Sequence, residues 1–244
     1  MNLERHSIET VDGQMTLLTA RPTSTPLGAV IVIQEAFGLT DHIGDICVRL
    51  AEAGFVAVAP ALFHRQPSQV VGYDAMGTDE GAALIMDLLG SLTAEGLAMD
   101  LDATLATLAT EGFDASETAI IGFCMGGAVA LFAGTRPGVS AAVSFYGGGV
   151  EVGRFGLPPL VDLAPSIRCD WLGLYGDLDT GIPITQVDAL SLAASSSSAN
   201  TEVVRYPDAG HGFNCNDRPD HFNADAAADA WARTLQFLRE HLSH

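Results

Sequence analysis

The sequence is short of basic residues. Eleven Lys and Arg stand against thirty Asp and Glu, which gives a formal net charge of −19 at pH 7. A surface this negative repels phosphate backbones and anionic lipid head groups. The charge therefore argues against nucleic-acid partners and against binding to a membrane surface.

Cysteines are also few. Cys47, Cys124, Cys169 and Cys215 are far apart and form no C-x-x-C pair, so neither a disulfide scaffold nor a zinc ribbon is expected. Free thiols suit a reducing compartment, and we expect a cytoplasmic protein. The charged start, MNLERHSIET, lacks the apolar segment of a signal peptide. No apolar run reaches the roughly 18 residues of a membrane span.

Apolar residues and glycine are abundant. The 244 residues are 48% hydrophobic and include 26 glycines, which is enough for a large core with close backbone packing. Although 244 residues exceed the commonest domain size, α/β folds often reach about 250 residues as one unit. We therefore expect a single domain over residues 1–244.

The order of hydrophobic patterns predicts an α/β fold. Alternation around the Asp12-Gly13 turn predicts an antiparallel hairpin in the first twenty residues. Continuous apolar runs predict strands buried on both faces, and helical periodicity predicts the helices between them. The expected strands are 29–33, 55–59, 117–122, 141–145, 171–175 and 201–206, and the expected helices are 41–53, 82–89, 96–111, 125–135, 184–195 and 223–241. Residues 151–168 are expected to be a Pro-rich loop.

These alternating units predict one open, mainly parallel central sheet with helices on both faces, preceded by the antiparallel hairpin. In such sheets the chemistry gathers in the loops at the carboxyl ends of the strands. The residues in those loops are therefore the candidates for a functional site.

The segment Gly122-Phe123-Cys124-Met125-Gly126-Gly127 has the pattern of a nucleophile elbow with cysteine in the serine position. A buried strand runs into a sharp turn and a helix starts at once. The glycines avoid collisions in that turn, and the helix N-terminus favours a thiolate on Cys124. A small buried thiol beside a tight turn is the structural alternative.

A histidine and two aspartates follow later strands. His211 lies between glycines after strand 201–206, where a base can reach the elbow. Asp177 and Asp179 follow strand 171–175, and either is available as the acid that orients the histidine. We favour Asp179 because it lies further into the loop, whereas Asp177 is suited to capping the turn.

The chain resembles the dienelactone hydrolase family, the carboxymethylenebutenolidase type of α/β-hydrolase. The matching segments are QEAFG at 34–38, GFCMGG at 122–127, FYGG at 145–148, GDLDTGIP at 176–183 and AGHGF at 209–213. The resemblance implies an α/β-hydrolase fold and a triad of Cys124, Asp179 and His211. It also implies a role for Glu35, whose family counterpart contacts the thiol and helps to deprotonate it when substrate binds.

The loop around Glu35 also suggests how an oxyanion is stabilised. A carboxylate at the end of an apolar strand needs a partner if it is buried, and a thiol or imidazole is one alternative to an arginine. The amides of Ala36 and Met125 lie where the two oxyanion-hole donors of this fold belong. The predicted function is hydrolysis of a small ester or lactone, without a metal or organic cofactor.

The resemblance also implies two arginines that bind the dienelactone carboxylate, one in the middle segment and one four residues after the histidine. Cys215 occupies the second position, and no arginine occurs between Arg65 and Arg154. Arg65 and Arg218 reach the pocket only if their loops fold inward. We therefore expect small neutral esters or lactones, rather than dienelactone itself, as substrates.

Other functions are open at this stage. A thioesterase or acyltransferase uses the same triad, and a binding protein can retain the pocket without catalysis. A thiol redox protein needs a resolving cysteine, for which Cys215 is available. The oligomeric state is not predicted.

Overall fold

The computed structural model describes residues 2–242, apart from the side chain of Met76. Its centre is an eight-stranded sheet with the strand order β1-β2-β4-β3-β5-β6-β7-β8. β1 and β2 form the predicted antiparallel hairpin, β2 pairs with β4 antiparallel, and the other neighbours are parallel. The strands are β1 Leu3–Thr10, β2 Gly13–Ala20, β3 Ala29–Ile33, β4 Val56–Pro60, β5 Thr118–Phe123, β6 Ala141–Phe145, β7 Asp170–Gly176 and β8 Thr201–Tyr206.

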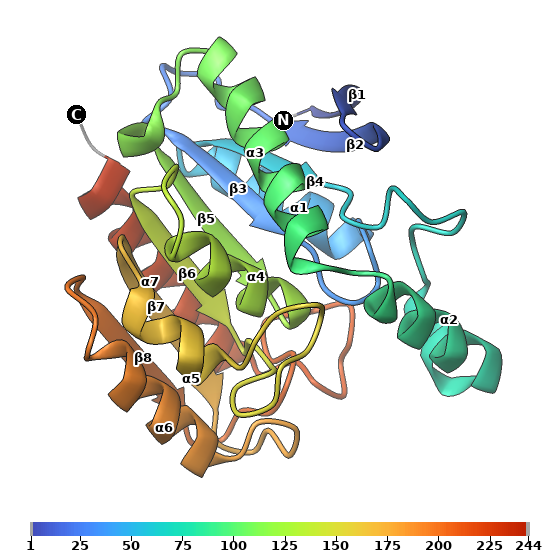
Figure 1. Ribbon diagram of the computed structural model, residues 1–244, viewed down its shortest axis with the longest axis vertical. Coiled ribbons are helices and arrows are strands. Elements are labelled where there is room, and N and C mark those ends of the chain that lie inside the picture. The colour runs from blue at the N-terminus through green and yellow to red at the C-terminus, as the bar shows by residue number, and fades with distance from the viewer. Residues whose placement is uncertain (1, 243–244) are drawn as a thin grey trace.

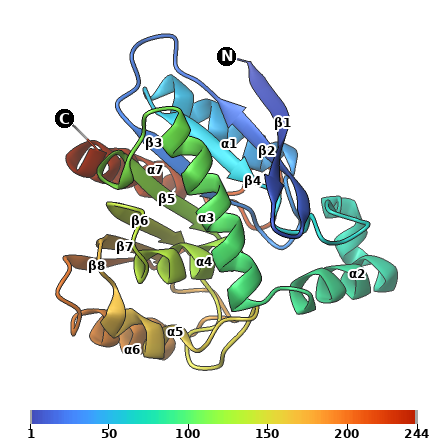
Figure 2. The same ribbon diagram turned by 45° about the horizontal axis from the view of Figure 1, so that its top comes forward.

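Helices cover both faces of the sheet. Figure 1 shows α3, α4 and α6 in front of it and α1 and α7 behind it, and α2 lies beyond the carboxyl ends of the strands. The turned view in Figure 2 shows the same two layers. The helices are α1 Asp41–Glu52, α2 Asp79–Gly90, α3 Ala94–Thr110, α4 Met125–Gly134, α5 Leu160–Leu163, α6 Ile184–Ala194 and α7 Ala224–Leu242, with 3-10 turns η1 Tyr73–Gly77, η2 Ala115–Glu117 and η3 Ala164–Ser166. The α/β-hydrolase fold is confirmed.

The central strands explain why the apolar runs were informative. Every residue of β3, β4, β5 and β6 is buried, as expected for parallel strands covered by helices on both faces. The loops after β3, β5, β6, β7 and β8 therefore meet at one edge, which is where the candidate residues lie.

One part of the predicted secondary structure was wrong. Residues 160–166, expected to belong to a loop, form the short α5 helix and the η3 turn. The prolines that suggested a loop stand at the helix starts, with Pro159 as the N-cap of α5 and Pro165 in the first turn of η3. A helix start needs no amide hydrogen bond, so it accepts proline readily.

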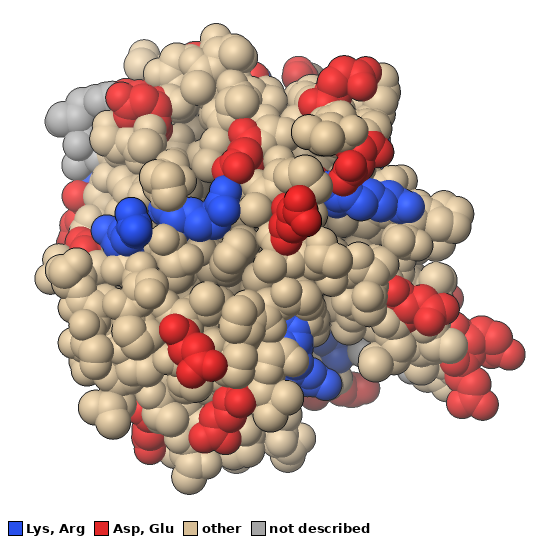
Figure 3. All heavy atoms as spheres, viewed as in Figure 1, with Lys and Arg blue, Asp and Glu red and all other residues tan. Residues whose placement is uncertain are grey.

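The surface carries the expected excess of acidic groups. The face in Figure 3 shows more red than blue side chains, and the blue ones do not gather into a large patch. Within residues 2–242, no single helix is long and apolar enough to cross a membrane. The pair α2 and α3 passes that test together, by length and composition only, with a bend of 79° between the helices.

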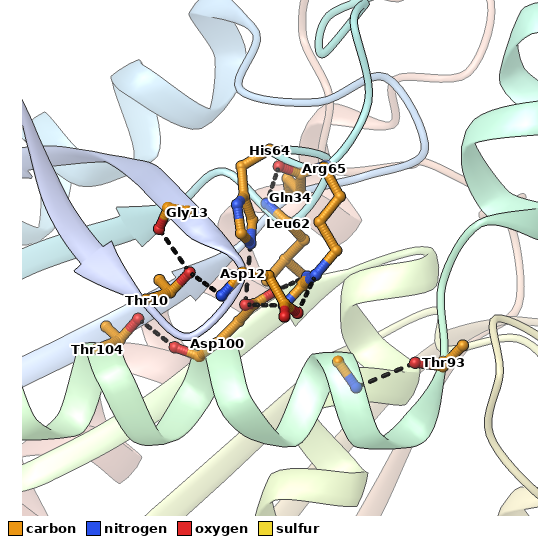
Figure 4. A network of polar contacts seen from close by, with 11 residues as sticks. Thr10, Asp12, Gly13, Gln34, Leu62, His64, Arg65, Thr93, Asp100 and Thr104 are labelled. Carbon is orange, nitrogen blue, oxygen red and sulfur yellow. Dashed lines mark hydrogen bonds and ion pairs between the residues drawn. The ribbon is translucent and has the colours of Figure 1, made fainter.

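A buried carboxylate joins the hairpin turn to the helical layer. Asp100 of α3 is fully buried and accepts hydrogen bonds from His64 at 3.0 Å and from both terminal nitrogens of Arg65 at 2.8 Å. The Nε of Arg65 also donates to Asp12 in the turn between β1 and β2, at 2.8 Å. Figure 4 shows these side chains pointing toward one another from three segments.

This network predicts a contrast between two aspartates of α3. Asp100→Ala should lower the free energy of unfolding by about 3–5 kcal/mol, because it leaves the buried His64 side chain and the half-buried Arg65 without their shared partner. Asp102 forms an ion pair with Arg136 but is mostly exposed, so Asp102→Ala should cost no more than about 1 kcal/mol. Urea denaturation measures both. Equal losses would contradict a structural role for the Asp100 network.

Candidate active site

Cys124 occupies the turn between β5 and α4. Its φ of 56° is unusual for a residue other than glycine, and backbone strain of this kind costs on the order of 1–3 kcal/mol and is common at active sites. A Cβ on Gly122 would collide with the Gly126 carbonyl, and a Cβ on Gly126 would collide with the carbonyls of Ile33 and Gln34. The two glycines therefore permit the close packing that holds the partly exposed Cys124 at the end of β5.

His211 and Asp179 form a hydrogen-bonded pair. The Nδ1 of His211 lies 2.7 Å from Oδ2 of Asp179, and the carboxylate is buried while the imidazole is partly exposed. The other oxygen, Oδ1, accepts from the amides of Gly181 and Ile182 at 2.8 and 3.2 Å. Because both carboxylate oxygens are bound, Asp179 is fixed and directs the Nε2 of His211 away from itself.

The charge of Cys124 acts directly on this histidine. Burial alone would lower the pKa of His211, but the neighbouring thiolate and the hydrogen bond with Asp179 raise it to about 10. An opposite charge at close range favours the protonated form of an imidazole. The arrangement therefore favours the imidazolium form of His211 at neutral pH.

Asp177, the alternative acid, points elsewhere. It binds Arg205 through two hydrogen bonds, at 2.7 and 3.1 Å. Of the two aspartates in this loop, Asp179 is thus the one that the fold brings to His211.

The two expected oxyanion donors are available. The side chains of Ala36 and Met125 are buried. Neither backbone amide donates a hydrogen bond to another described residue, whereas the adjacent Cys124 amide donates to Phe145 at 3.0 Å. Two unused amides beside a nucleophile are what an oxyanion hole requires.

Glu35 is bound to a tyrosine in this structure. Its carboxylate is buried, and the hydrogen bond that the described residues give it comes from the Tyr73 phenol, 3.4 Å away, and not from Cys124. The Tyr73 hydroxyl also lies 3.1 Å from that of Thr40. The buried Tyr146 ring lies 5.0 Å from the His211 ring, and burial together with the charge of Glu35 raises the pKa of its phenol.

Cys124, Asp179 and His211 share a cavity of about 490 Å³. Its walls come from α2, from the loop after β6 and from the loop after β7. The other residues that line it are Met86, Leu89, Gly90, Gly148, Arg154, Phe155, Thr180, Gly181 and Ile182. Apart from Arg154, Asp179 and His211 the lining residues carry no charge, so the cavity suits a small molecule that is mainly apolar.

Arg154 is a pocket residue that the sequence analysis missed. The expectation of a pocket without an arginine, unless Arg65 or Arg218 folded inward, was wrong. Arg65 is held by Asp100, and Arg218 lies over the Phe37 ring and donates to His221. The position of Arg154 just after the glycines that follow β6 was the available signal.

A close backbone approach fixes the loop that carries Arg154. Gly156 has a φ of 73°, and a Cβ there would collide with the backbone of Leu92 and Thr93, between α2 and α3. Phe155 has a φ of 58°, again unusual outside glycine. The loop is thereby held against α2, and Arg154 is placed at the cavity.

The profile of the Dienelactone hydrolase family matches residues 15–242 of this sequence. The chain belongs to the dienelactone hydrolase family. It is 38% identical to a "Putative carboxymethylenebutenolidase" of Yersinia pestis over 218 residues, which are 88% of this chain and 79% of that protein. Members of this family are hydrolases of the ester or lactone type, and that general activity agrees with the cavity and its side chains.

Two solved structures show how far the likeness extends. The "Putative Dienelactone Hydrolase" of Klebsiella pneumoniae superimposes with a TM-score of 0.82 at 33% identity, over 97% of this chain and 98% of that one. A "Dienelactone Hydrolase-like Promiscuous Phospotriesterase" from metagenomic libraries gives a TM-score of 0.76 at 25% identity, over 98% of both chains. The family likeness therefore extends over nearly the whole chain.

The raised pKa of His211 predicts how alkylation of Cys124 depends on pH. The His211 imidazolium should persist from acid to a pH near 10, and its positive charge should assist attack by the neighbouring sulfur. Between pH 6.5 and 9, iodoacetamide should therefore alkylate Cys124 faster in the wild type than in His211→Gln, and the difference should shrink above pH 10. Peptide mapping separates Cys124 from the other thiols. Equal rates in the two proteins would rule out this assistance by His211.

Proposed function

We propose that this chain hydrolyses small esters or lactones through a cysteine nucleophile, Cys124, with His211 as the proton carrier and Asp179 as the residue that orients it. The observation that supports this most is the 2.7 Å contact between Asp179 and His211 in the same cavity as the Cys124 turn. A hydrogen bond between the Cys124 side chain and the imidazole contributes to the raised pKa of His211, which further supports this pairing.

The reaction begins with attack of the Cys124 thiolate on the ester carbonyl carbon, which forms a carbon–sulfur bond and an oxyanion. The His211 imidazolium then gives its Nε2 proton to the leaving alkoxide as the carbon–oxygen bond breaks. Water attacks the thioester, Nε2 takes a proton from it, and the thiolate leaves as the acid is formed. Asp179 holds the Nδ1 proton throughout and so fixes the tautomer.

The amides of Ala36 and Met125 are the proposed donors to the oxyanion. Losing one such donor costs about 10²–10³ in rate in related hydrolases. Glu35 immediately precedes Ala36, and its buried carboxylate holds this loop through Tyr73. We therefore assign Glu35 a positioning role at the oxyanion donor rather than contact with the thiol.

The proposed partner is a small molecule with an apolar body and an acidic substituent. Arg154 is the only arginine among the described residues that line the cavity, and it has no carboxylate partner among them. Guanidinium groups bind carboxylates through paired, charge-assisted hydrogen bonds. The expected preference for neutral substrates depended on a pocket without such a group. The proposal names a substrate class and not dienelactone itself.

The two aspartates of the β7 loop test the mechanism. Asp179→Asn should lower kcat for p-nitrophenyl acetate by as much as about 10⁴, the loss seen when a serine-protease triad acid becomes an amide. Asp177→Asn should leave kcat nearly unchanged and weaken only an ion pair with Arg205, worth about 1 kcal/mol or less. Cys124→Ala should be inactive. An active Cys124→Ala, or a larger loss in Asp177→Asn, would contradict these assignments.

A second pair of variants tests the substrate class. Arg154→Gln should lower kcat/KM for an ester with a carboxylate in its acyl group by about 10–100-fold, because a charge-assisted hydrogen bond contributes about 1.5–3 kcal/mol. The neutral methyl-ester analogue should be unaffected. Arg168 is exposed just before β7 starts, at the opposite edge of the sheet, so Arg168→Gln is the matched control. Equal effects on both substrates would refute the role of Arg154.

A further inference from the structure

A second group of reactive side chains lies apart from the catalytic cavity. One oxygen of Glu35, one nitrogen of His42 and the sulfur of Cys215 all lie within 4.8 Å of one another. They come from the β3–α1 loop, from α1 and from the loop after β8. None of the three is among the described residues that line the cavity.

All three side chains are buried, with exposed fractions of 1%, 0% and 0% for Glu35, His42 and Cys215. Both ring nitrogens of His42 and the Oε1 of Glu35 lack a hydrogen-bond partner among the described residues. A buried polar atom without a partner costs about 1–3 kcal/mol. One nitrogen of this unpartnered imidazole and one oxygen of the Glu35 carboxylate lie within 4.8 Å of each other and of the Cys215 sulfur, which indicates an occupant that bonds to all three side chains.

The chemistry of these atoms identifies the class of occupant. An imidazole nitrogen, a carboxylate oxygen and a thiolate sulfur are together the ligand types of Zn²⁺. A water molecule satisfies the carboxylate and the imidazole but gains little from a thiol, which is a weak hydrogen-bonding group. A bound cation deprotonates a coordinating thiol, which makes the sulfur a strong ligand.

We propose that Glu35, His42 and Cys215 bind one divalent transition metal ion of the zinc class. The Cys215 thiol releases its proton to solvent as the sulfur–metal bond forms. Three protein ligands leave a fourth position, and the Tyr73 hydroxyl lies next to the site, 3.4 Å from Oε2 of Glu35 and 3.6 Å from the Cys215 sulfur. The proposed hydrolysis needs no metal, so the ion acts on the position of the Glu35 loop and takes no part in breaking or forming bonds.

The surrounding fold suits a bound ion. Gly38 has a φ of 86° and a Cβ there would collide with the Gln69 carbonyl, so the chain at 69–71 packs directly on the Glu35 loop. Val71 donates to the Phe37 carbonyl at 2.9 Å and continues into Tyr73, which covers the site. Because Glu35 lies beside Ala36, an ion would link the loop that carries the Ala36 amide to His42 of α1. The same ion would link that loop to Cys215 in the segment that follows His211.

Cobalt titration tests this site. Cys124→Ala protein, freed of metal with EDTA, removes the competing cavity thiol. One equivalent of Co²⁺ should bind and produce a thiolate-to-cobalt charge-transfer absorption with d–d bands typical of low coordination number. Adding Cys215→Ala to this protein should abolish the charge-transfer band. Adding His42→Ala should weaken cobalt binding by more than ~10–100-fold, which is the loss expected when only a residue hydrogen-bonded to a metal ligand is removed. Cys169 is also a buried free thiol, so Cys169→Ala is the matched control and should leave the spectrum unchanged.

Several outcomes would overturn the proposal: no charge-transfer band in Cys124→Ala, a band that survives Cys215→Ala, or a band lost in Cys169→Ala. Circular dichroism checks that each variant is folded. If Cys215→Ala does not fold, X-ray absorption of zinc-loaded Cys124→Ala decides. One sulfur with nitrogen and oxygen neighbours supports the site, and a shell without sulfur rejects it. Ester turnover by the wild-type chain is measured separately, so failure here is distinguishable from failure of the proposed function.

Discussion

The close packing of β5 against the start of α4 is the constraint on which the site depends. It requires glycine at 122 and 126, and it holds Cys124 at a φ of 56°. Strain at one residue persists only where the surroundings over-determine it. Here the fully buried β3, β5 and β6 supply that rigidity. The same parallel register brings the loops of β7 and β8, with Asp179 and His211, to the edge where Cys124 emerges.

Three buried carboxylates differ in how completely they are paired with hydrogen-bond donors. Asp100 is paired with Arg65 and His64, and Asp179 with His211 and two amides. Glu35 has one long contact with Tyr73 and an oxygen without a partner among the described residues. Burying a charge is costly unless it is paired. The pairing of Asp100 anchors the hairpin turn to α3, and the pairing of Asp179 orients His211. The incomplete pairing of Glu35 is the observation that leads to the proposed metal site.

The sequence predicted the features that depend on neighbouring residues along the chain. Continuous apolar runs gave the buried strands, and the glycine spacing around Cys124 gave the turn. Asp179 was preferred over Asp177 from its place in the loop, and the structure brings it to His211. Arg154 was missed because its place in the cavity depends on the contact of Gly156 with the α2–α3 connection. The Glu35–His42–Cys215 cluster was missed because its members meet only through tertiary packing.

The central claim is that Cys124 carries the acyl group during turnover, and intact-protein mass spectrometry tests it most directly. The enzyme is mixed with a p-nitrophenyl ester whose bulky acyl group slows deacylation, and the reaction is quenched in acid within the first turnover. The account predicts a burst of nitrophenol, one acyl group per chain and its location on the peptide that contains Cys124. Turnover without acylation, or acyl transfer to a different residue, would contradict the account.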